Sequence, residues 1–75
     1  MSYTPQEFYR FIEASTGRKF TTNQKREILI QDIIRLTRND IKLTEIDIYT
    51  KIYKIWKLPD EDIIKRFNKW FKADL

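Results

Sequence analysis

The fold is decided by residues 44–71, which read TEIDIYTKIYKIWKLPDEDIIKRFNKWF. In the first half of this stretch, isoleucines recur at helical spacing and aromatic residues follow each of them: Ile48, Ile52 and Ile55, then Tyr49, Tyr53 and Trp56. The alternation at 46–48 alone would suit a strand, but the longer period predicts a helix over 44–57. Leu58-Pro59 ends that helix, because the residue before a proline is pushed away from helical backbone angles. The acidic residues 60–62 complement a helix dipole, so a further helix is predicted over 60–73.

Two more helices are predicted upstream by the same kind of start signal. Thr4 and Thr21 each stand three residues before an acid or amide side chain, as in a capping box, and Thr44 repeats the pattern. Gly17 is a natural end for the first of them. The helices are therefore expected over 5–16 and 22–39. The sequence predicts an all-α fold, a compact small bundle of four short helices that forms a single domain over residues 1–75.

The apolar residues of the first two helices indicate which sides could pack. In the first helix, Phe8, Phe11 and Ile12 share one face. Most aliphatic residues of the second helix fall in one broad sector: Leu29, Ile30, Ile33, Ile34 and Leu36. Ile28 falls among the polar residues instead. We expect it either to pack under the first helix or to stay available to a partner.

The composition excludes the common catalytic chemistries. The chain has no His and no Cys, so it has no Ser–His–Asp triad, no Cys–His pair and no conventional zinc site. A single glycine cannot build a phosphate-binding loop, and the acidic run lacks the spacing of a calcium loop. We expect a binding protein, not an enzyme, with neither metal nor cofactor. No signal peptide precedes the first helix, and no apolar run approaches the ~20 residues of a membrane span, so a cytoplasmic protein without a membrane partner is expected.

The charge distribution points to an anionic partner. Residues 51–75 carry seven basic and four acidic side chains, against eight and seven in residues 1–50. Leu58 and Ile63 hold a spacing that resembles the turn of helix-turn-helix DNA-binding proteins, which implies a transcription-regulatory role. The chain departs from that pattern at Lys57, where glycine is usual, and at the acidic residues 60–62, which would repel the DNA backbone. The side chains expected to contact nucleic acid are basic: Lys51, Lys54, Lys57, Lys65, Arg66, Lys69 and Lys72.

The alternative is a protein-binding inhibitor or adaptor. Eleven residues are aromatic, which is more rings than so small a core easily hides, and Tyr and Trp commonly anchor interfaces. The candidate contact residues are Tyr9, Ile28, Tyr49, Tyr53 and Trp56. The competing explanation is that these side chains fill the core. A small chain also gains core by pairing, so a homodimer is one form of this hypothesis. The charge of the last third of the chain places DNA binding first.

Overall fold

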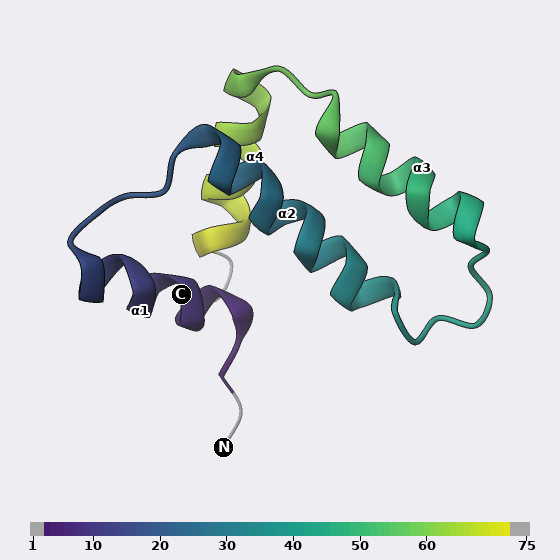
Figure 1. Ribbon diagram of the computed structural model, residues 1–75, viewed down its shortest axis with the longest axis horizontal. Coiled ribbons are helices and arrows are strands. Elements are labelled where there is room, and N and C mark those ends of the chain that lie inside the picture. The colour runs from purple at the N-terminus through teal and green to yellow at the C-terminus, as the bar shows by residue number, and fades with distance from the viewer. Residues whose placement is uncertain (1–2, 73–75) are drawn as a thin grey trace.

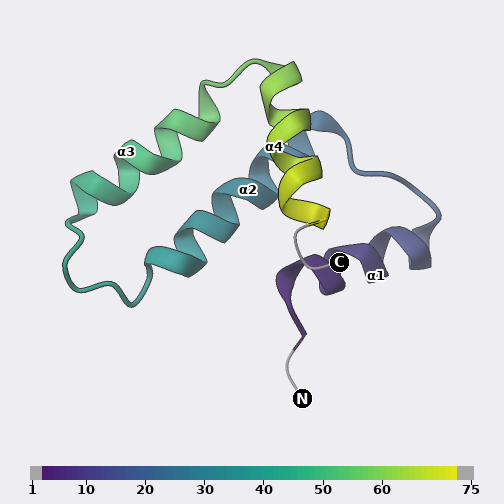
Figure 2. The same ribbon diagram turned by 180° about the vertical axis from the view of Figure 1, so that it is seen from behind.

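Four helices make up the computed structural model, which describes residues 3–72 (Figure 1). They are α1 (Pro5–Thr16), α2 (Thr22–Thr37), α3 (Glu45–Trp56) and α4 (Asp60–Lys72). The described residues contain no strand, so the predicted all-α fold is confirmed. α2 and α3 lie side by side as a hairpin, and α4 crosses α2, behind it in Figure 1 and in front of it in Figure 2. The bundle is flat, with extents of 39 × 35 × 19 Å.

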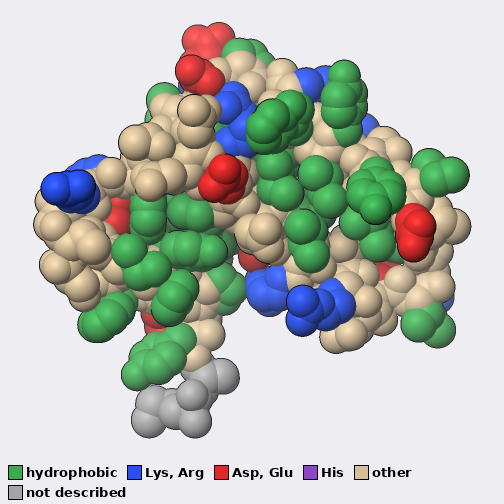
Figure 3. All heavy atoms as spheres, in the orientation of Figure 1, with side chains coloured by type: hydrophobic (Ala, Val, Ile, Leu, Met, Phe, Trp, Pro, Cys, Tyr) green, Lys and Arg blue, Asp and Glu red, His purple; other side chains and the backbone are tan. Residues whose placement is uncertain are grey.

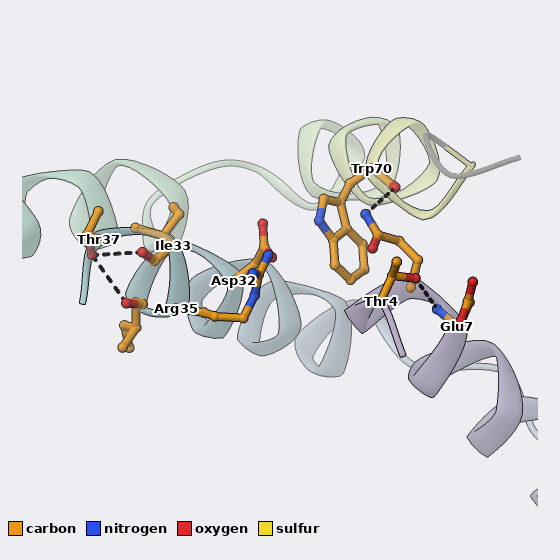
Figure 4. A network of polar contacts seen from close by, with 9 residues as sticks. Thr4, Glu7, Asp32, Ile33, Arg35, Thr37 and Trp70 are labelled. Atoms are coloured by element: carbon orange, nitrogen blue, oxygen red, sulfur yellow. Dashed lines mark hydrogen bonds and ion pairs between the residues drawn. The ribbon is translucent and has the colours of Figure 1, made fainter. Parts of the chain in front are cut away.

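Threonines cap the first three helices: Thr4, Thr21 and Thr44. In each case the hydroxyl accepts a hydrogen bond from the amide three residues later, at 3.2 Å, as Figure 4 shows for Thr4 and Glu7. Gln24 and Asp47 complete their capping boxes, because their side chains accept from the cap amides at 2.9 and 3.0 Å. These bonds satisfy amides that have no partner within a helix, which is why the helices begin at these residues.

The helix ends follow from equally local causes. Gly17 ends α1 in the left-handed backbone region, at a φ of 67°, and its amide bonds to the Glu13 carbonyl. α2 ends at Thr37, two residues before the predicted end, because the Asp40 amide bonds to the Thr37 carbonyl at 3.1 Å and starts a turn. Lys57 caps α3 and does not belong to it. The predicted last residue of the final helix, 73, lies outside the described residues.

α2 occupies the centre of the core. The buried apolar side chains come from three helices: Ile28 and Leu29 of α2, Ile55 of α3, and Ile63 and Phe67 of α4. Ile28, whose place the sequence left open, is only 6% exposed and lies toward Tyr9 of α1. It therefore belongs to the core and cannot belong to an exposed contact patch.

α1 docks through Tyr9. The Tyr9 ring lies 5.8 Å from the ring of Phe20 and 6.2 Å from that of Trp70, centroid to centroid. Tyr9 is half-buried and packs against the core, so only part of its side chain is left for the predicted protein contact. Phe8 and Phe11 stay exposed, because α1 meets its neighbours along one narrow stripe and that stripe includes Tyr9.

Arg26 of α2 holds the turn between α3 and α4. Its guanidinium donates to the Leu58 carbonyl at 2.9 Å and to the Asp60 carboxylate at 3.0 Å. A third bond reaches the Asn23 side chain at 3.1 Å. Both α3 and α4 pack chiefly on α2, so this side chain secures the point where the two helices meet.

Candidate functional site

The basic side chains predicted to contact nucleic acid all lie on the surface. Three belong to α3 and its cap, and four belong to α4: Lys51, Lys54 and Lys57, then Lys65, Arg66, Lys69 and Lys72. None of them forms an ion pair with another residue of 3–72. Lys57 instead places its Nζ 5.6 Å from the ring centroid of Tyr53. The fold thus leaves these cations exposed and without an ion pair among residues 3–72.

Two of these cations, Arg66 and Lys69, border a groove that α2, α3 and α4 enclose, with a volume of about 630 Å³. Its other lining residues are Leu29, Asp32 and Ile33 of α2, Ile55 of α3 and Trp70 of α4. Leu29 and Ile55 are buried, so they form an apolar floor beneath the exposed cations. Figure 4 shows the Trp70 side chain reaching from α4 toward α2, near Asp32. We call this site the basic groove.

The charge of the basic groove is not neutralised from within. Asp32 lies at the groove, but Arg35 holds its carboxylate at 2.7 Å. Arg66 and Lys69 have no anionic partner among residues 3–72. Either cation could therefore form a charge-assisted hydrogen bond to a bound carboxylate without first breaking an ion pair within residues 3–72.

A second surface runs along α3. Four large apolar side chains share its outer side, and together we call them the aromatic ridge: Ile46, Tyr49, Tyr53 and Trp56. All four are exposed, which places three of the predicted protein-contact residues on the surface. Figure 3 shows hydrophobic side chains gathered over the α2–α3 hairpin and, separately, over α1.

The gathering on α1 was missed by sequence reasoning. Tyr3, Glu7, Phe8 and Phe11 line a hollow of about 440 Å³ there. The sequence did contain a sign of it. Aromatic rings at positions 8, 9 and 11 of one helix cannot all point toward a single neighbouring helix, so some of them must be exposed.

The segment that resembles a helix-turn-helix consists of α3, its turn and α4. The N-terminal turn of α4 presents Asp60, Glu61 and Asp62. Asp60 pairs with Arg26, while Glu61 and Asp62 have no ion pair within residues 3–72. The first turn of the would-be recognition helix is therefore negative, and the basic residues of α4 lie further along it.

The remaining titratable groups form no reactive cluster that the structure describes. Within residues 3–72 no three acidic, His or Cys side chains are placed to hold a metal ion. The pKa of Asp47 is lowered, chiefly by the hydrogen bond from the Thr44 amide, then by the Thr44 hydroxyl and the charge of Lys51. The capping box therefore accounts for most of this shift.

No helix in the described part of the chain has the length and apolar character to cross a bilayer. Comparison with protein families, curated proteins and solved structures finds no match to this chain.

Proposed function

We propose that this chain is a non-enzymatic protein-binding module whose basic groove holds an acidic, amphipathic segment of a partner protein. The observation that supports this proposal most is the apolar floor beneath two cations that lack internal partners. In such interfaces apolar burial supplies affinity, while complementary charge sets orientation and association rate. Arg66 and Trp70 are also of the residue types that most often dominate binding energy.

The spacing of the cations specifies the segment further. Arg66 and Lys69 are three residues apart on α4, so they lie about one helical turn from each other. Two carboxylates separated by one turn on a partner helix would match them, with apolar side chains of the same helix on the groove floor. An amphipathic helix laid into a hydrophobic groove is a common mode of peptide recognition.

A fluorescein-labelled peptide tests this binding mode by fluorescence anisotropy. The peptide is helical, with Leu and Phe on one face and Glu beside them at three- and four-residue spacing, and its control carries Lys in place of Glu. The Glu peptide should bind and the Lys peptide should not. Changing Arg66 and Lys69 together to Ala should weaken binding by about 10- to 100-fold, if each charged contact contributes as in other interfaces.

The matched control removes the same charge from the same helix. Lys65 and Lys72 lie on α4 but do not line the groove. Changing both to Ala should alter peptide affinity by less than about threefold, because exposed charges outside a contact contribute little. Equal losses in the two double variants would show that the groove is not the binding site.

Nucleic-acid binding is the second candidate, and the exposure of all seven predicted basic side chains favours it. Binding to phosphates depends on summed charge, so the two double variants should weaken a mobility shift with generic duplex DNA to a similar degree. The shift should also decline steeply between about 50 mM and about 200 mM salt. Absence of a shift at the lower salt concentration would reject this candidate.

A further inference from the structure

The aromatic ridge of α3 is a row of large apolar side chains that the rest of residues 3–72 leaves uncovered. The exposed fractions are 76% for Ile46, 67% for Tyr49, 61% for Tyr53 and 60% for Trp56. Successive members are three, four and three residues apart, which keeps them on one side of the helix. This spacing reads the same in both directions along α3.

We propose that the ridge is the interface of a homodimer, in which α3 packs antiparallel against α3 of a second copy. Because the spacing is symmetric, an antiparallel copy matches it position for position. Tyr49 then lies beside the partner's Tyr53, and Ile46 lies beside the partner's Trp56. A two-fold interface of this kind must be self-complementary, and the ridge meets that requirement.

The charges along α3 favour the same orientation. Its first turn carries Glu45 and Asp47, while Lys54 and Lys57 lie in its last turn and at its cap. Antiparallel packing brings the acidic end of each helix to the basic end of the other. Parallel packing would bring like charges together and would also align the two helix dipoles unfavourably.

The small core indicates a second copy as the occupant of the ridge. Five apolar side chains are buried within residues 3–72, and chains of this size commonly complete their core by oligomerisation. The pairing also leaves the basic groove open, because the groove is lined by Ile55 of α3 and by none of the four ridge residues. The dimer therefore does not depend on what the groove binds.

Sedimentation equilibrium of the full chain tests the dimer. The average mass should rise from 9.3 kDa toward twice that value between about 5 and about 500 µM, as for a micromolar Kd. Tyr49→Glu should keep the chain at the monomer mass throughout, with an unchanged far-UV circular dichroism spectrum because Tyr49 is exposed. Tyr3→Glu is the matched control, since it makes the same change on the α1 hollow, and the dimer should survive it. A monomer at every concentration, or a dimer lost only in Tyr3→Glu, would overturn the proposal.

Disulfide trapping tests the antiparallel register, because the chain has no cysteine of its own. A mixture of Ile46→Cys and Trp56→Cys chains should form a mixed disulfide on oxidation. Ile46→Cys alone should not, since two antiparallel copies hold these positions ten residues apart, or about 15 Å along the helix axis. A disulfide between two Ile46→Cys chains in place of the mixed one would overturn the antiparallel arrangement. Absence of both would overturn pairing through the ridge.

Discussion

Replacing Phe67 with alanine should remove much of the stability of the folded chain. Phe67 is 2% exposed and its ring lies among three others, 6.2 Å from Phe20, 5.7 Å from Trp70 and 4.9 Å from Phe71, centroid to centroid. The ammonium of Lys25 lies 5.4 Å from the same ring. These contacts join α2, α4 and the segment that follows α1, so no single neighbour can move to fill the space.

The expected loss can be worked from these contacts. A core Phe→Ala substitution costs about 3–5 kcal/mol, which includes the cavity that it leaves. Aromatic pairs at these distances contribute about 0.5–1.5 kcal/mol beyond the buried area, so a loss of about 4 kcal/mol is expected. A folded chain of this length has only about 4–11 kcal/mol of stability in total. The variant should therefore melt roughly 15–30 °C lower, or be unfolded at room temperature.

Thermal and urea unfolding, followed by circular dichroism, measure this loss. Phe11→Ala is the matched control, because it removes the same atoms from an exposed position on α1. Its cost should stay within about 0.5 kcal/mol, as for most surface substitutions. Equal losses in the two variants would refute the assignment of buried and exposed faces, on which both the basic groove and the aromatic ridge depend.

Two further predictions concern polar contacts that hold the helices in place. Arg26→Ala should cost about 2–3 kcal/mol in urea unfolding, because it removes the bond to the Leu58 carbonyl, whereas Asp60→Asn should cost less than about 1 kcal/mol because Asp60 is exposed. Asp47 has a lowered pKa in the folded chain, so its contribution to stability is present above about pH 4 and is lost as the pH falls through the folded pKa. The melting temperatures of the parent and of Asp47→Asn should therefore differ at neutral pH and converge in acid; a constant difference would show that ionisation of the cap contributes nothing.

The helix positions were predictable because their signals are local. A threonine hydroxyl at residue 4, 21 or 44 satisfies an amide three residues away, and Pro59 interrupts the backbone next to itself. None of these effects needs a distant neighbour. The end of α2 was predicted two residues too late. The turn at Asp40 ends the helix, and the spacing of the aliphatic residues contains no signal for that turn.

The candidate site was predictable only in part. The sequence identified Arg66 and Lys69 as basic residues of a helix that were expected to contact nucleic acid. It could not place them beside Leu29 and Ile55, because those residues come from other helices and meet the cations only after packing. Tyr49, too, was named as a contact residue because Tyr and Trp commonly anchor interfaces, with core filling as the competing explanation. Only the packed structure shows that its side chain is exposed.

By itself, the sequence determined an all-α chain with four helices and no thiol or imidazole, since capping bonds, backbone preferences and composition act over a few residues. Only the tertiary structure decided which part of each apolar arc is buried. When the apolar side chains of a helix spread over a wider arc than the neighbouring helix can cover, some of them must stay exposed. On α1 the neighbours cover Tyr9 and leave Phe8, and on α3 they cover Ile55 and leave Tyr53. That choice depends on where α2 and α4 lie, and long-range packing around Ile63 and Phe67 sets their positions.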